Sequence, residues 1–273
     1  AHGIYESHHA LITTPGNHDM LSSFYPARCR PEISRLGILI LYAVMLIPAG
    51  QAYAEKIIRT EKVTLKVEEI VRGLEHPWGL AFLPDGRMLI TERPGRLRLI
   101  ERDGSLLSRP VQGLPPISAH GQGGLLDVAL HPDFHSNALV YLSYAGPGKG
   151  DMGTEVVRGR WNGTDLENTE VIFRMLPKSG TGRHFGSRLV FDLEGRLYIT
   201  LGDRGNRPRA QKLNDQAGSV IRLNADGSVV EDNTFAQKMN AFPEIFSYGH
   251  RNIQGAALHP VSGELWAHEH GPQ

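Results

Sequence analysis

His184 is the residue in this sequence best suited to acid–base chemistry. It stands between Arg183 and Arg188 in the stretch TGRHFGSRLVFDLEGRLYITLGDRG, whose alternating apolar residues predict two β-strands joined by a short turn. Asp203 follows the second strand, and a hairpin returns the chain to the edge where it began. The carboxylate can therefore meet the imidazole and orient it as a general base near neutral pH. The alternative is a structural turn histidine that is hydrogen-bonded to the backbone.

A second candidate group is Arg251, Asn252 and Gln254 in the stretch SYGHRNIQG. A guanidinium and two amides are suited to binding planar carboxylates and carbonyls. The alternative is an ordinary polar loop between two sheets.

Two glycine-containing stretches complete the candidates. Gln122 lies among glycines in GQGGLLDVALHPDF, where the backbone can approach a ligand closely. The stretch EHGPQ contains Gly271 and Pro272, whose carbonyl oxygens are of the kind that Ca²⁺ accepts. Neither signal is decisive without the others.

The elements that would position these residues are repeated β-hairpins. An apolar strand, a turn and a second apolar strand recur at residues 78–93, 125–144, 187–203 and 255–270. Glycine and proline are frequent, with 31 and 17 copies, as expected of a turn-rich chain. The recurring hairpin predicts an all-β fold of propeller blades and is less typical of a β-sandwich.

The N-terminal part has the features of an export signal. Residues 28–54 combine arginines, an apolar core at 36–47 and a small-x-small pattern, which predicts a secretory signal peptide. An N-terminal membrane anchor is the alternative. Residues 1–27 lie upstream of this signal, and the sequence does not indicate whether they are translated. Residues 55–273 are expected to form the propeller. The formal net charge of zero argues against a nucleic-acid partner.

Taken in order, four stretches resemble one family. GQGGLLDVALHPDF, GRHFGSRLVFDLEGRLYITLGDRG, YGHRNIQG and EHGPQ are similar in order and spacing to the soluble glucose/sorbosone dehydrogenases, nearest to their aldose sugar dehydrogenase branch. The resemblance implies a six-bladed β-propeller that holds pyrroloquinoline quinone (PQQ) and Ca²⁺. Since the hairpin copies stop at residue 270, we expect an incomplete, C-terminally truncated ring of about four blades.

The resemblance also implies roles for the candidate residues. His184 matches the catalytic base, and Asp203 matches the carboxylate that orients it. Gln122 matches a residue that lines the substrate and cofactor cavity. The cofactor-contacting positions are matched by Arg251, Asn252 and Gln254, and the calcium ligands by the carbonyls of Gly271 and Pro272. Arg183 stands where some glucose-oxidising members have an acidic residue, so the preferred sugar is not implied.

The expected activity is oxidation of an aldose sugar to a lactone in the periplasm or outside the cell, by hydride transfer to PQQ. The expected partners are the sugar and an external electron acceptor, without nucleic acid and without stable membrane insertion after signal cleavage. Two alternatives stay open at this point. One is a calcium-dependent propeller lactonase that needs no quinone, and the other is a non-catalytic propeller that binds a sugar or a protein.

Overall fold

The described part of the protein consists almost entirely of β-strands. A computed structural model describes residues 56–271, so residues 1–27, the predicted signal at 28–54 and Pro272 lie outside the described residues. Within that range, no helix is long and apolar enough to cross a membrane. The strands are β1 (Lys56–Arg59), β2 (Thr64–Val67), β3 (Pro77–Phe82), β4 (Met88–Glu92), β5 (Arg96–Ile100), β6 (Leu125–Leu130), β7 (Leu139–Pro147), β8 (Met152–Trp161), β9 (Leu166–Arg174), β10 (Leu189–Phe191), β11 (Leu197–Thr200), β12 (Ser219–Leu223), β13 (Ile245–Tyr248), β14 (Ile253–Leu258) and β15 (Leu265–Glu269); the short helices are α2 (Phe134–Asn137) and the 3₁₀ turn η1 (Arg207–Gln211).

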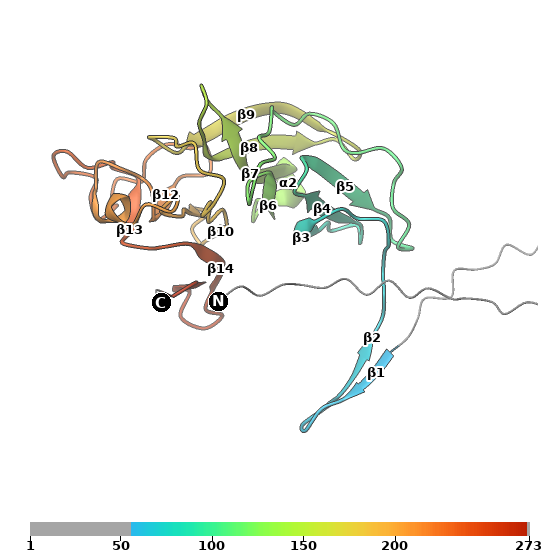
Figure 1. The fold of residues 1–273 in the computed structure, drawn as a ribbon. Helices are drawn as coiled ribbons and strands as arrows, with labels where there is room; N and C mark the ends of the chain where they lie inside the picture. Colours follow the sequence, from blue (N-terminus) through green and yellow to red (C-terminus); the bar gives the residue numbers. More distant parts are fainter. Residues whose placement is uncertain (1–55, 272–273) are drawn as a thin grey trace, which may run out of the picture. The chain divides into compact units, whose positions relative to one another are not determined.

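The strands form antiparallel sheets in chain order (Figure 1). Strands β6 to β9 make one four-stranded sheet and β10 to β13 another, while β3 to β5 make a three-stranded sheet and β14 pairs with β15. A separate pair joins β1 to β2. All four predicted hairpins are confirmed, since β3 pairs with β4, β6 with β7, β10 with β11, and β14 with β15.

Turn chemistry explains why the hairpins close where they do. The β3–β4 turn has Gly86 at a φ of 88°, a left-handed conformation that favours glycine. Asp85 precedes it and accepts a hydrogen bond from the Arg87 main-chain N–H at 3.0 Å. The β10–β11 turn also has a left-handed glycine, Gly195, at a φ of 79°. Here the Arg196 main-chain N–H donates to the Asp192 carboxylate at 2.7 Å. These local signals are readable in the sequence, and they fix the strand registers.

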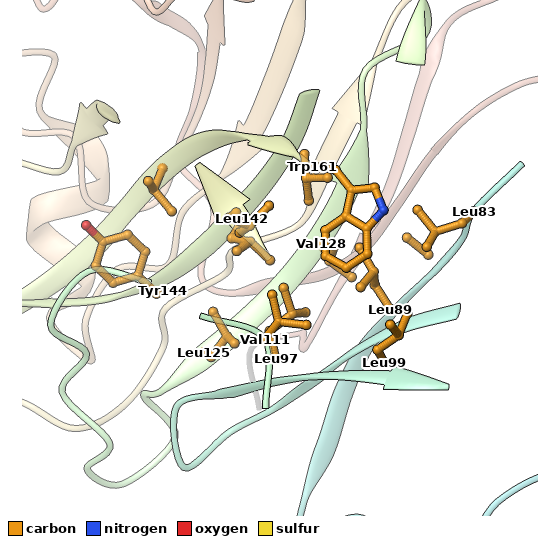
Figure 2. Close-up of a cluster of buried hydrophobic side chains, with 14 residues drawn as sticks. Leu83, Leu89, Leu97, Leu99, Val111, Leu125, Val128, Leu142, Tyr144 and Trp161 are labelled. Carbon is orange, nitrogen blue, oxygen red and sulfur yellow. The ribbon is translucent and has the colours of Figure 1, made fainter. Parts of the chain in front are cut away.

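The core lies between successive sheets. The sheet of β6 to β9 contributes side chains from both of its faces to this core. On β7, Leu142 and Tyr144 belong to the cluster that is shared with β4 and β5, shown in Figure 2 with Leu97 and Trp161. Tyr141 points the other way and packs in a second cluster, with residues of β11 and β12. Successive antiparallel sheets packed face to face are typical of propeller blades and not of a two-sheet sandwich. A ring of six blades stays a prediction.

Replacement of Leu97 by alanine tests this core. Leu97 is 0% exposed in the first cluster, so we expect a loss of about 2–5 kcal/mol in the free energy of unfolding. Leu193→Ala is the control, because Leu193 is 84% exposed in the β10–β11 turn and its loss should cost under about 0.5 kcal/mol. Equilibrium denaturation measures both, and equal effects would contradict the assigned core.

Candidate active site

His184 and Asp203 meet at one end of the β10–β11 hairpin. His184 Nδ1 lies 2.6 Å from Asp203 Oδ1, and the two side chains are 16% and 2% exposed. The same Asp203 oxygen accepts a hydrogen bond of 2.7 Å from the Gly205 main-chain N–H. Since an ionised carboxylate only accepts, the Nδ1 nitrogen carries the proton in this bond, and in the neutral imidazole Nε2 has the lone pair. The hairpin thus brings together the two residues that the sequence analysis paired.

The backbone around His184 has an unusual conformation. His184 has a φ of 54°, and Ser187 a φ of 87°, although both are non-glycine residues. Such conformations cost about 1–3 kcal/mol each and persist where neighbouring contacts impose them. The His184 N–H donates to Gln122 Oε1 at 2.8 Å, and the Gly186 N–H donates to Asn252 Oδ1 at 3.0 Å. Two amide side chains therefore hold the main chain on either side of the imidazole.

Asn252 connects this loop to the next candidate segment. It is buried, and its Oδ1 also accepts a hydrogen bond of 3.1 Å from Gln254 Nε2. Glu269, which sequence analysis missed, accepts hydrogen bonds from the main-chain N–H groups of Arg251 at 2.6 Å and Asn252 at 3.0 Å. In the sequence, Glu269 ends the last predicted hairpin and begins the EHGPQ stretch, but neither feature indicates which groups its carboxylate binds.

A cavity of about 680 Å³ lies in front of these residues. Its walls include six of the predicted site residues, namely Gln122, His184, Arg251, Asn252, Gln254 and Gly271. Asp203 does not line this cavity and is connected to it through the His184 imidazole. The cavity wall also includes residues for which the sequence predicted no role, namely Trp78, Arg93, Gly121, Leu126, Phe185, Gly186 and His270.

The cavity is suited to an anionic, planar ligand. The guanidinium groups of Arg93 and Arg251 line it, and neither forms an ion pair with a carboxylate within residues 56–271. Arg93 donates to the Gly121 carbonyl, and Arg251 Nη1 donates to the Gly271 carbonyl at 3.0 Å. Guanidinium groups that have only carbonyl partners keep capacity for carboxylates. This donor set fits PQQ, which bears several carboxylates.

The expected calcium ligands do not form a comparable site. The Gly271 carbonyl accepts the hydrogen bond from Arg251, so a cation already lies beside it, and Pro272 is outside the described residues. No group of three or more His, Cys, Asp or Glu residues that could hold a metal occurs among residues 56–271. The described residues therefore do not by themselves show a calcium site, and calcium binding at the Gly271 and Pro272 carbonyls stays a prediction.

Arg188 does not accompany the imidazole as its place in the sequence suggests. Its guanidinium lies 3.0 Å from Asp127 Oδ1 and 4.2 Å from the centre of the Trp78 ring. It also donates to the Gln254 carbonyl at 2.8 Å. Burial raises the pKa of the Asp127 carboxyl, while the charge of Arg188 acts in the opposite direction. Arg188 therefore connects strands β3, β6 and β14.

Replacement of Asn252 by alanine should loosen the loop that carries His184. The change leaves the buried Gly186 N–H without its acceptor, which costs about 1–3 kcal/mol. We expect faster hydrogen exchange at the Gly186 amide and a lower unfolding midpoint. Asn252→Asp keeps the acceptor oxygen and is the matched control; equal exchange in both variants would contradict the assigned bond.

Comparison with known proteins identifies the family of this chain. Residues 74–273 match the family described as Glucose / Sorbosone dehydrogenase. Aldose sugar dehydrogenase YliI from Escherichia coli (strain K12) is 47% identical over 214 residues, which cover 77% of this chain and 57% of the relative. The crystal structure of the soluble aldose sugar dehydrogenase from Escherichia coli in the apo-form matches with a TM-score of 0.71 and 47% identity, over 73% of this chain and 58% of that one.

A further solved structure is titled as the PQQ-bound form of aldose sugar dehydrogenase from Streptomyces coelicolor. It matches with a TM-score of 0.65 and 29% identity, over 80% of this chain and 61% of that one. The chain thus spans less than two thirds of the length of these relatives. The family match, the level of identity and the shared fold agree, and the chain belongs to the glucose/sorbosone dehydrogenase family.

Proposed function

We propose that the protein oxidises aldose sugars at the anomeric carbon to lactones, with PQQ as the hydride acceptor. The observation that carries the proposal is the 2.6 Å bond between His184 Nδ1 and Asp203 Oδ1, at the wall of a cavity lined by two guanidinium groups that bond only main-chain carbonyls within residues 56–271. Family membership supports a PQQ-type sugar dehydrogenase, and a relative was solved with PQQ bound.

His184 acts as the general base in this proposal. Its Nδ1 proton is held by Asp203, so Nε2 can accept the proton of the anomeric hydroxyl. The imidazolium that results is stabilised by the Asp203 carboxylate. When bound, PQQ supplies the electrophilic carbon that accepts the hydride from the anomeric carbon. Loss of that proton and that hydride converts the sugar to its lactone.

The other cavity residues position the reactants. Arg93 and Arg251 would hold carboxylates of the cofactor, and the amides of Gln122 and Gln254 can hydrogen-bond cofactor or sugar oxygens. Trp78 and Phe185 supply apolar wall that limits the access of water. The preferred sugar is not part of the proposal.

Three further features extend the proposal beyond the described residues. Export to the periplasm rests on residues 28–54. The reduced cofactor passes its electrons to an external acceptor. Calcium binding rests on the resemblance alone, with the carbonyls of Gly271 and Pro272 as the proposed ligands, and no step above depends on it.

An assay with added PQQ tests the proposal. Full chain is mixed with PQQ, with and without Ca²⁺, and reduction of an electron-accepting dye is followed with several aldoses. We expect dye reduction only when protein, PQQ and sugar are all present. Lactone hydrolysis without added quinone would favour the lactonase alternative. Sugar binding without turnover would favour the binding-protein alternative, and either result contradicts the proposal.

A further inference from the structure

Arg204 is a fully buried arginine beneath the His184 loop, and the function proposed above gives it no role. It follows Asp203 directly in the Gly-Asp-Arg-Gly turn, and its φ of 57° is left-handed. Its side chain is 0% exposed, and no carboxylate forms an ion pair with it within residues 56–271. Burial of a charge without an ionic partner costs free energy of folding, so other contacts must compensate for the burial of Arg204.

The contacts of Arg204 bracket His184 along the chain. Its Nη1 donates to the main-chain carbonyl of Arg183, the residue before the base, and its Nη2 donates to the carbonyl of Thr181. Its guanidinium carbon lies 3.5 Å from the centre of the Phe185 ring, the residue after the base. Thr181 Oγ1 returns a hydrogen bond of 2.7 Å to the Arg204 carbonyl.

These contacts connect Arg204 to the His184–Asp203 pair. Asp203 bonds the His184 ring, while its chain neighbour Arg204 bonds the main chain that carries the ring. The turn therefore binds both the imidazole and the loop beneath it. A guanidinium suits this position because its planar donors can reach two carbonyls while one face covers a ring. A lysine ammonium has donors too, but it is compact and not planar, so it cannot stack a flat face on the ring while its donors bond both carbonyls.

We propose that Arg204 is a positioning residue for the His184 base: it holds residues 181–185 so that the imidazole stays aligned on Asp203. The kinetic part of this inference rests on the proposed function. The structural part concerns only the hydrogen bond between His184 and Asp203 and requires neither cofactor nor sugar.

Proton NMR of the full chain without cofactor gives the first test. A His184 Nδ1 proton bonded to a carboxylate should give a far-downfield signal, assigned by its loss in His184→Ala. We expect Arg204→Met to lose or broaden this signal. Arg222→Met is the matched control, because Arg222 is also buried, lies 5.0 Å over the Phe246 ring and bonds Asn233 and Asp232, without contact to the loop. It should keep the signal.

Kinetics with PQQ and an aldose give the second test. Arg204→Met should lower kcat about 100-fold with KM changed less than about threefold, since misplacing a reacting group by an ångström costs about that much. Arg222→Met should keep kcat within about twofold. Should Arg204→Met fail to fold, Arg204→Lys decides, with an expected loss of about tenfold and a weakened signal.

Three outcomes separate the possibilities. A folded Arg204→Met or Arg204→Lys variant with the wild-type downfield signal and kcat would overturn the inference and leave Arg204 as a core residue. Loss of the signal equally in Arg222→Met would also overturn it, because any buried arginine would then suffice. Absence of sugar oxidation in the wild type would refute the proposed function, while the NMR comparison would still decide the role of Arg204.

Discussion

Replacement of His184 by alanine should lower kcat by between about 10² and 10⁴, the usual contribution of a positioned general base. The imidazole is the one titratable ring among the predicted site residues that both lines the cavity and has its second nitrogen held by a carboxylate. Without it, no described neighbour at this wall can take the hydroxyl proton with the same geometry. KM should change little, because the guanidinium and amide groups that hold the reactants remain.

The control for this variant is His259→Ala. His259 lies in the β14–β15 turn, stacks on Trp266 and has no place at the cavity wall. We expect its removal to leave kcat within about twofold. Both variants are measured with dye reduction at saturating sugar, and thermal unfolding is recorded for each. An active His184→Ala variant would remove the imidazole from the reaction and with it the proposed mechanism.

The hairpins could be predicted from the sequence because their signals are local. Alternating apolar residues and a glycine in each turn specify β3–β4 and β10–β11 without reference to the rest of the chain. The approach of Asp203 to His184 follows from the same logic, since both residues flank one hairpin. Family resemblance then identified cavity residues in the loops that precede β6, β10 and β14 and in β14 itself.

The supporting contacts between sheets could not be predicted, because they depend on how successive sheets stack. Gln122 bonds the His184 main chain across 62 residues of sequence, and no local signal indicates that pairing. Glu269 differs, because it flanks the β14–β15 hairpin opposite Arg251, and the logic that pairs Asp203 with His184 also applies to it. Arg188 shows the converse. It is close to His184 in the sequence, but its side chain turns to Asp127 on a neighbouring sheet. Adjacency in the chain is a poor guide where strand direction decides which way a side chain points.

Replacement of Asp203 by asparagine should lower kcat about 5- to 30-fold, a smaller loss than replacement by alanine. One Asp203 oxygen accepts from both His184 Nδ1 and the Gly205 N–H. An asparagine can keep its amide oxygen at that position, because the Gly205 N–H needs an acceptor there. The imidazole should then retain its tautomer and lose only the charge that stabilises the imidazolium. Hydrogen bonds to charged groups exceed neutral ones by about 1–2 kcal/mol, which gives this range.

Asp203→Ala removes the acceptor as well as the charge. The Nδ1 proton then has no fixed partner, so the ring can rotate or shift its proton to Nε2, and kcat should fall by about 10² or more. The pair of variants therefore separates two functions of one carboxylate, charge stabilisation and control of the tautomer. The downfield Nδ1 signal should persist in weakened form in Asp203→Asn and vanish in Asp203→Ala. If the two variants lose activity equally, the amide oxygen of Asp203→Asn does not replace the carboxylate as acceptor of the Nδ1 proton, which contradicts the assigned separation of the two functions.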